Sequence, residues 1–299
     1  MILWGEFMGK VLKRIDWTNS LFLTLTPVAA VAAVIGHVMY EGFNPWTLLI
    51  AFFFYWATGM SITVGYHRLF AHRSFEAHPI IQFFTLVFGA ASFENSALKW
   101  CSDHRVHHTH VDTEEDPYNI KKGFFWAHIG WIMVRPTKPE TYPMSADLRR
   151  NKLVMWQHRY YLPLSIFVGI IVPTLIGAWM GSPLGGLGIG ALGRIVLVHH
   201  TTFFINSLCH MVGDKTFNDE HTARDSWITA IFTFGEGYHN FHHTFQADYR
   251  NGVRWYHFDP GKWVIKSMSW VGLTRKLKKV SDETIAMARI QMKDKGVHA

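Results

Sequence analysis

Cysteine is the scarcest chemically reactive residue in this chain of 299 residues, which has only Cys101 and Cys209. Two cysteines give no disulfide framework of the kind that holds small secreted domains together. They also provide no spacing for an iron–sulfur cluster and no Cys-x-x-Cys-His haem attachment. We expect both thiols to be buried space-fillers in a reduced protein that faces the cytoplasm.

Charged residues are also few, at 17%, whereas 49% of residues are hydrophobic and 15% are aromatic. This balance is too apolar for an ordinary soluble enzyme and too polar for a chain that lies wholly within a membrane. We recognise no Rossmann fingerprint and no His-Pro-Gly-Gly haem motif, so we expect any electrons that the protein needs to come from a separate protein. The net charge of +7 could suggest nucleic acid. Its distribution instead indicates a membrane surface.

Four apolar runs are long enough to span a bilayer, at residues 21–39, 46–66, 161–180 and 187–205. The first is not a signal peptide, because no small-residue cleavage site precedes polar sequence and the second run follows at once. A shorter run at 80–93 is expected to be interfacial or re-entrant.

Basic residues predict the topology. Residues 1–20 hold 3 Lys and Arg, residues 67–160 hold 12, and residues 207–299 hold 13, whereas the turns at 41–45 and 181–186 hold none. The positive-inside rule then predicts two helical hairpins with both termini in the cytoplasm. We therefore expect one all-α membrane domain over 1–299, with a cytoplasmic helical cap formed by 67–160 and 207–299. Only Arg194 lies within a span.

Three histidine clusters are the strongest chemical signal. One has the spacing His-x-x-x-x-His and two have His-x-x-His-His, which on a helix places all three imidazoles on one face. Neutral imidazole is the commonest metal ligand, and eight of them are more than one ion can bind. All three clusters fall on the same predicted side of the membrane, so the sequence predicts a two-metal centre there. The eight residues are His67, His72, His104, His107, His108, His239, His242 and His243.

The order and surroundings of these clusters resemble the membrane-bound fatty acid desaturases, in particular the delta-9 (stearoyl-CoA-type) branch. The resemblance covers about residues 58–259. It is carried by Asn95-Ser96-Ala97-Leu98, Trp100, Asp103-His104-Arg105, Asp116-Pro117 and Gly235-Glu236-Gly237-Tyr238-His239-Asn240-Phe241-His242-His243.

The resemblance implies two irons with O2 as co-substrate and adds His210 as a ninth ligand, with Asn206 bonded to a metal-bound water. One iron would be held by His67, His72, His104, His108 and His242, and the other by His107, His210, His239 and His243. Carboxylates beside metal-bound imidazoles orient them through the other ring nitrogen. We expect Asp103, Asp116 and Glu236 to do so.

Hydrolysis by zinc is disfavoured because no glutamate lies inside a histidine motif as a general base. Oxidation of an unactivated methylene fits better, and O2 then needs two electrons from a separate donor protein of cytochrome, ferredoxin or rubredoxin type with its reductase. An acyl desaturase is the favoured function. A hydroxylase of the same superfamily and a membrane metal-binding or transport protein are the alternatives.

The acyl carrier stays open among CoA, lipid and carrier protein. The resemblance implies that substrate contacts come from Tyr55, Gly59, Glu94, Asn95, Trp100, Asp103, Arg135 and Thr202. Helical spacing puts Tyr55 and Gly59 on one face, where Gly59 is expected to leave space at the far end of an acyl tunnel. Ser102 and Pro136 stand where animal members have Arg and Lys, so two cationic contacts to CoA phosphates are missing. Glu94 replaces the Gln of those members near the tunnel.

The other histidines are expected to be less specific. His199 and His200 are expected either to pack or to support the metal ligands, and the remainder to be solvated or interfacial. That remainder is His37, His78, His110, His128, His158, His221, His257 and His298. The segment from Lys262 onward, with its basic run at 275–279, is expected to be an amphipathic surface helix on anionic lipid or a solvated helix.

Overall fold

The protein is represented by a computed structural model that describes residues 14–135 and 145–296. Lys10, Lys13, Pro136 and His298 lie outside these ranges. The described chain is helical apart from one two-stranded antiparallel sheet, in which β1 (Glu76–Ala77) pairs with β2 (Thr274–Arg275), and three isolated bridges. The prediction of an essentially all-helical protein is confirmed.

Four helices are long and apolar enough to cross a membrane, as the sequence predicted. The first, second and fourth are longer than expected. The second continues beyond its apolar run into polar sequence as far as Ala71, and the fourth as far as His210. The four are Trp17–Glu41 (α2 and η1), Trp46–Ala71 (α3 and η2), Tyr161–Trp179 (α9, η5 and α10) and Pro183–His210 (α11, η6, α12 and η7).

The second helix carries the first histidine cluster into the protein interior. Its α-helical part, α3 (Trp46–Met60), continues as the π-helical segment η2 (Ser61–Ala71), in which every residue is buried. Polar side chains can therefore follow the apolar run without a break in the helix, because protein rather than lipid surrounds them. Helix α4 (Pro79–Ala90) is apolar and too short to span, in agreement with the prediction for this region.

The two turns that join the long helices lie side by side. The Glu41 carboxylate accepts hydrogen bonds from the backbone N–H groups of Leu184 (2.8 Å) and Gly185 (3.3 Å), at the start of the fourth long helix. A carboxylate is favourable there, because the first N–H groups of a helix lack partners within it. His37 is fully buried, 3.0 Å from Glu41, so the expectation that it is solvated or interfacial was wrong.

Glycines let the fourth long helix pack closely on its neighbours. A Cβ at Gly188 would lie 2.9 Å from the backbone N of Val34, and one at Gly186 would lie 2.7 Å from the carbonyl oxygen of Pro173. Gly188, Gly190 and Gly193 have the spacing Gly-x-Gly-x-x-Gly. They lie within a membrane helix and follow no strand, so they form no dinucleotide site.

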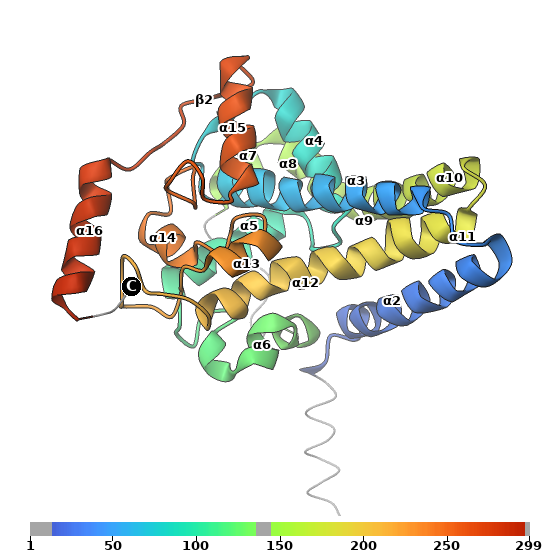
Figure 1. The fold of residues 1–299 in the computed structure, drawn as a ribbon, viewed down its shortest axis with the longest axis horizontal. Helices are drawn as coiled ribbons and strands as arrows, with labels where there is room; N and C mark the ends of the chain where they lie inside the picture. Colours follow the sequence, from blue (N-terminus) through green and yellow to red (C-terminus); the bar gives the residue numbers. More distant parts are fainter. Residues whose placement is uncertain (1–13, 136–144, 297–299) are drawn as a thin grey trace, which may run out of the picture.

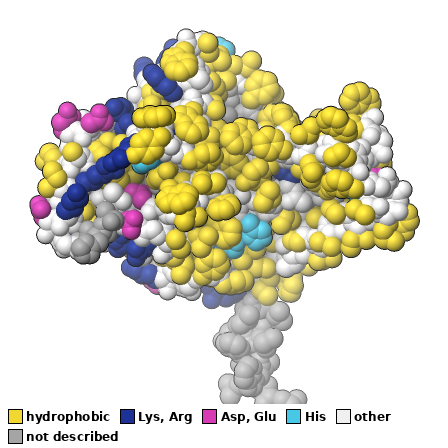
Figure 2. Space-filling model, viewed as in Figure 1, with side chains coloured by type: hydrophobic (Ala, Val, Ile, Leu, Met, Phe, Trp, Pro, Cys, Tyr) yellow, Lys and Arg dark blue, Asp and Glu magenta, His cyan; other side chains and the backbone are white. Residues whose placement is uncertain are grey.

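The remaining elements form a helical cap at one end of the long helices (Figure 1). A core of buried apolar residues from η2, α4, α5, α8 and α15 joins the cap to the second long helix. Lys and Arg side chains gather on the cap, whereas the face over the long helices is largely hydrophobic (Figure 2). The cap helices are α5 (Ala97–His110), α6 (Phe124–His128), α7 (Ala146–Arg150), α8 (Lys152–Arg159), α13 (Trp227–Phe232), α14 (His239–Thr244), α15 (Pro260–Trp270) and α16 (Asp282–Asp294), with 3₁₀ turns at Ile120–Lys122 and Gly130–Met133.

The basic run at 275–279 is not helical, which corrects the expectation for the C-terminal segment. Arg275 belongs to β2, and the residues from there to Ser281, the N-cap of α16, have no regular secondary structure. Arg275 and Lys276 both pair with Glu76, at 2.9 and 2.7 Å, and the backbone N–H of Lys278 donates to Ser74. These contacts hold the run against the segment after the second long helix, so it cannot coil.

Candidate metal centre

Local sequence explains how the histidine helices begin. Ser96 is the N-cap of α5, and its side chain accepts a hydrogen bond from the backbone N–H of Lys99. Helix α14 follows Gly235, which has φ = +92°. A Cβ at Gly235 would lie 2.7 Å from Cα of Asp259, so glycine is required there by both conformation and space.

The structure brings all nine predicted histidines together in two groups, and within each group the possible ligand atoms lie within 4.8 Å of one another. Each group draws on three or more segments that are distant in sequence. The first group is His67, His72, His104, His108 and His242, and the second is His107, His210, His239 and His243. These are the two sets that the resemblance implied.

In both groups the same ring atom, Nε2, points inward. The Nε2 atoms of His67 and His242 are 3.0 Å apart, and those of His72 and His104 are 2.8 Å apart. In the second group, His239 Nε2 lies 3.2 Å from that of His210. Nitrogen lone pairs that converge at such distances repel each other unless a cation lies among them. The arrangement therefore fits bound metal ions.

Carboxylates on the outer ring nitrogens fix this orientation. His67 Nδ1 lies 3.0 Å from Glu236 Oε2, and His107 Nδ1 lies 2.9 Å from Asp116 Oδ1. A carboxylate that accepts the Nδ1 proton leaves the Nε2 lone pair free for a metal. Two of the three carboxylates predicted for this role thus contact histidines. Asp103 instead pairs with Lys99 at 3.4 Å.

Two further supports were not predicted. His210 Nδ1 is 2.7 Å from Thr222 Oγ1, and Thr222 donates through both its hydroxyl and its backbone N–H to Asp112, each at 2.7 Å. The Tyr118 hydroxyl lies 3.3 Å from His104 Nδ1. No spacing rule connects residue 112 with residue 222, so sequence reasoning had no signal for the first contact. Asp112 does lie in the acidic stretch that follows the second cluster.

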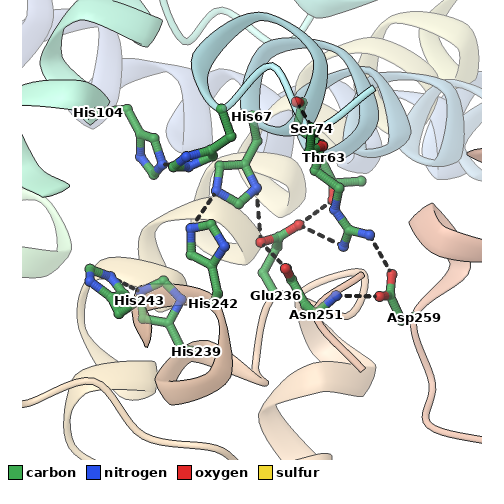
Figure 3. Close-up of polar contacts among 12 residues, drawn as sticks. Thr63, His67, Ser74, His104, Glu236, His239, His242, His243, Asn251 and Asp259 are labelled. Atoms are coloured by element: carbon green, nitrogen blue, oxygen red, sulfur yellow. Dashed lines mark hydrogen bonds and ion pairs between the residues drawn. The ribbon is translucent and has the colours of Figure 1, made fainter. Parts of the chain in front are cut away.

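Glu236 is the centre of a buried polar network (Figure 3). Besides His67 it accepts hydrogen bonds from Thr63, from Arg68 Nη2 at 3.0 Å and from Asn251 Nδ2 at 2.6 Å. Arg68 also pairs with Asp259 at 2.9 Å. Burial by itself raises the pKa of Glu236, but the adjacent His67 and Arg68 outweigh this effect and hold the pKa below its usual range. Glu236 is therefore ionised at neutral pH.

Outside the long helices, six imidazoles of the centre have a lowered pKa and are therefore neutral at pH 7. Burial lowers the pKa of His72, His104, His108, His242 and His243 well below the usual value, and neighbouring imidazoles lower it further. The pKa of His239 falls to about 3 for the same reasons. Neutral imidazole is the form that binds metal.

Two more histidines in this part of the protein were expected to be solvated or interfacial, and that expectation was wrong. His221 is 7% exposed, its ring lies 5.2 Å from that of His243, and neither of its ring nitrogens has a hydrogen-bond partner among the described residues. His128 is also 7% exposed, and its Nε2 lies 3.0 Å from His200 Nδ1. His200 therefore supports His128 rather than a metal ligand.

Cys101 and Cys209 are buried, as predicted.

Apart from Arg135, the predicted substrate residues come from the second and fourth long helices, from the loop before α5 and from α5. The Glu94 carboxyl accepts a hydrogen bond from Thr202 at 2.9 Å, and Trp100 stacks on His104 with ring centroids 4.9 Å apart. Tyr55 bonds Thr201 at 3.0 Å and contacts the Phe234 ring.

The space beside Gly59 is filled. A Cβ at Gly59 would collide with the Phe234 ring, so the glycine accommodates this ring rather than leaving an opening. Phe234 comes from the cap, directly before the third cluster, and sequence reasoning had not connected it with Tyr55 and Gly59.

The other predicted residues lie at the edges of the site. Asn95 has φ = +76°, and its backbone N–H donates to the Tyr161 hydroxyl at 3.0 Å. Arg135 is exposed at the end of the described segment, and its backbone N–H donates to Arg14. Asn206 is the last residue of α12 (Arg194–Asn206) and is half-buried.

The fold and the site together define a multi-pass membrane protein with paired histidine groups that could hold two metal ions. The family model for fatty acid desaturase matches residues 42–269. The chain belongs to the fatty acid desaturase family.

Individual relatives agree with this assignment. The chain is 43% identical over 252 residues to acyl-CoA desaturase 1 of Saccharomyces cerevisiae, covering 84% of this chain and 49% of the relative. It is 40% identical over 286 residues to a probable acyl-CoA desaturase of Schizosaccharomyces pombe, covering 95% of this chain and 59% of the relative. It is 31% identical over 267 residues to the sn-1 stearoyl-lipid 9-desaturase of Anabaena variabilis, covering 89% and 94%. The chain thus spans about half to three-fifths of the length of the two yeast relatives.

Proposed function

We propose that the protein is an O2-dependent acyl desaturase that introduces a cis double bond, at the delta-9 position, into a saturated acyl chain. One observation supports this proposal above all: in a member of the fatty acid desaturase family, nine histidines form a group of five and a group of four, and in both groups the Nε2 atoms point inward. The names of the relatives include both acyl-CoA and acyl-lipid desaturases.

The histidine groups are proposed to hold two iron ions, which imidazole ligands suit. Iron bound there would supply, with O2, an oxidant able to remove hydrogen from an unactivated methylene. The protein's part is orientation: Glu236 and Asp116 hold the Nδ1 atoms of His67 and His107, so both Nε2 lone pairs face inward. Asn206, at the end of the fourth long helix, is proposed to hold a water beside the second group.

The proposed setting is a membrane with both termini and the histidine centre on the cytoplasmic side, and with the long helices arranged as two hairpins. Electrons would come from a separate protein of cytochrome, ferredoxin or rubredoxin type with its reductase. The basic cap and the hydrophobic face over the long helices suit contact with membrane lipid (Figure 2).

The acyl carrier is proposed to be CoA or a membrane lipid. Asn95, Asp103 and Arg135 occupy positions that the resemblance assigns to CoA, but Ser102 and Pro136 provide no cation where the animal members have one. Each missing charge-assisted contact to a phosphate would be worth about 1.5–3 kcal/mol. Incubating the purified enzyme in parallel with labelled stearoyl-CoA and a stearoyl-phospholipid separates the two carriers.

Product analysis tests the function itself. A labelled saturated acyl substrate, with O2 and an electron-donor system, should give a cis double bond, whereas a hydroxylase would add oxygen to the chain. His107→Ala and His243→Ala should abolish the product while leaving the protein in the membrane. Full turnover in either variant would remove the histidine groups from the reaction.

A further inference from the structure

An arginine within the fourth long helix has no place in the mechanism above. Arg194 is 1% exposed and forms no ion pair among the described residues. An unpaired cation inside a membrane helix is costly, and such residues usually mark a functional position. Two of its nitrogens donate to backbone carbonyls: Nη1 to Ala91 at 2.7 Å and Nη2 to Gly169 at 2.6 Å.

The first of these carbonyls belongs to the end of a helix. Ala91 is the C-cap of α4, where carbonyl groups lack partners within the helix and a cation is favourable. Gly169, in the third long helix, lies so close that a Cβ there would be 3.0 Å from the Ala91 carbonyl oxygen and 2.7 Å from the Phe93 ring. The loop of residues 91–96 therefore packs tightly against the third long helix and is hydrogen-bonded to the fourth.

Two more side chains of the fourth helix hold the same loop. His199 is buried, and its Nε2 lies 2.9 Å from the carbonyl oxygen of Ser92. The hydroxyl of Thr202 donates to Glu94 at 2.9 Å. Arg194, His199 and Thr202 thus contact residues 91, 92 and 94, which fixes the loop along most of its length.

The loop is also held in a strained conformation. Phe93 and Asn95 both have positive φ, at +62° and +76°, although neither is glycine. Such residues persist only where the surrounding structure determines their conformation, and they gather at functional sites. The Tyr161 hydroxyl, which accepts from the Asn95 N–H, secures the loop from the third long helix.

The loop leads directly into the metal centre. It ends at Ser96, the N-cap of α5, and one turn later Trp100 stacks on His104 of the first histidine group. Glu94 and Trp100 are two of the proposed substrate contacts. Glu94 lies in this loop and Trp100 lies in the first turn of the helix that the loop leads into, so the fourth helix sets the position of the segment that carries both. A displacement of about 1 Å in a positioning group is enough to change reactivity by about 100-fold. Neighbouring carbons of an acyl chain are separated by little more than that.

We propose that Arg194 and His199 are positioning residues which, by fixing the loop 91–96, determine the carbon of the acyl chain at which the double bond forms. This inference rests on the proposed desaturase function. The two residues touch neither the histidine groups nor the carrier-binding positions in any contact described above, so they would act on the site of oxidation through the loop.

The test compares His199→Phe and Arg194→Lys with wild-type protein. Phe at position 199 retains a ring that can pack on Phe203 but cannot donate to the Ser92 carbonyl. Lys at position 194 retains the positive charge but lacks the planar guanidinium group, whose two Nη atoms reach the two carbonyls. Ser182→Ala is the matched control, because it removes a buried hydrogen bond to Glu41 at the opposite end of the long helices.

Double-bond positions in the product are the decisive readout. Wild type and Ser182→Ala should yield one predominant positional isomer, and the two variants should raise the fraction of displaced isomers at least several-fold at unchanged iron content. An unchanged isomer ratio in active His199→Phe and Arg194→Lys protein would overturn the inference. A loss of folding alone would lower yield without moving this ratio.

Hydrogen exchange tests the contact independently of turnover. Amides of residues 91–96 should exchange several-fold faster in both variants than in wild type or Ser182→Ala, with little change elsewhere in the protein. Unchanged exchange would contradict the holding role. If wild-type protein forms no unsaturated product, the proposed function fails instead, and the exchange result still decides whether the two side chains hold the loop.

Discussion

Replacing Glu236 with Gln should weaken metal binding by the first histidine group in addition to destabilising the fold. The change preserves the shape of the side chain but puts an amide among four donors: Thr63, His67, Arg68 and Asn251. At least one donor must then face the amide N–H₂, and Nδ1 of His67 loses its anionic acceptor.

The size of the effect follows from these contacts. Residues that orient a metal-binding histidine typically change metal affinity by about 10–100-fold when they are replaced, which is about 1.4–2.7 kcal/mol. Arg68 and Asn251 donate to different oxygens of Glu236, so the amide keeps one of these two bonds and loses the other. The lost bond adds a cost in folding stability of about 1.5–3 kcal/mol at most. Arg68 keeps its pairing with Asp259, which limits that cost.

A matched control separates the two effects. Asp248 is 2% exposed and pairs with Arg250 at 2.7 Å, and none of its described bonds goes to a histidine. Asp248→Asn therefore makes the same chemical change in a similar setting. Iron retention is measured against a series of chelator concentrations, with the thermal midpoint recorded for each variant. Equal iron retention in Glu236→Gln and Asp248→Asn would refute the role given to Glu236.

Three further outcomes are expected. Burial raises the pKa of Glu94 to about 8, so the folded protein holds a proton on this side chain that the unfolded chain releases at lower pH. The folding stability linked to that proton therefore falls as the pH rises toward 8. Turnover should decline above about pH 8, where Glu94 ionises in the folded protein. Glu94→Gln, which cannot ionise, should flatten this alkaline decline in a pH–rate profile, and a persistent decline would assign it to another group. Gly59→Ile must displace Phe234 and should lower the folded yield, whereas Gly59→Ile with Phe234→Ala should fold. Because the Phe234 ring already fills the space beside Gly59, the double variant should keep the wild-type ratio of stearoyl to palmitoyl turnover, and a lowered ratio would place Gly59 at an open tunnel end. Gly42→Cys and Leu184→Cys should react with an impermeant thiol reagent only from the non-cytoplasmic face, and labelling from the cytoplasm would overturn the proposed topology.

The histidine groups could be predicted because local spacing determines them. His239, His242 and His243 share a helix face whatever lies around them, and the family resemblance supplied His210, which spacing alone did not. The boundaries of the long helices were less predictable, since burial by the cap allows η2 to continue past His67. A run of apolar residues indicates which part of a helix faces lipid. It does not indicate where a helix ends when distant segments of the chain bury its polar residues.

Contacts between distant segments were beyond sequence reasoning. Asp112 supports His210 through Thr222, and Phe234 fills the space beside Gly59, although many residues separate the partners. The basic run at 275–279 has the composition of a surface helix, but it pairs with Glu76 and Ser74 and is not helical. Each of these features depends on which surfaces meet after folding.

The iron content of active protein tests the central claim most directly. Protein purified with iron supplied should contain about two iron ions per chain and turn over an acyl substrate, one ion for each histidine group. Zinc binds nitrogen ligands more tightly than ferrous iron, so protein from zinc-rich expression should contain zinc and be inactive until iron replaces it. Full activity with one iron per chain, or with zinc alone, would contradict the account.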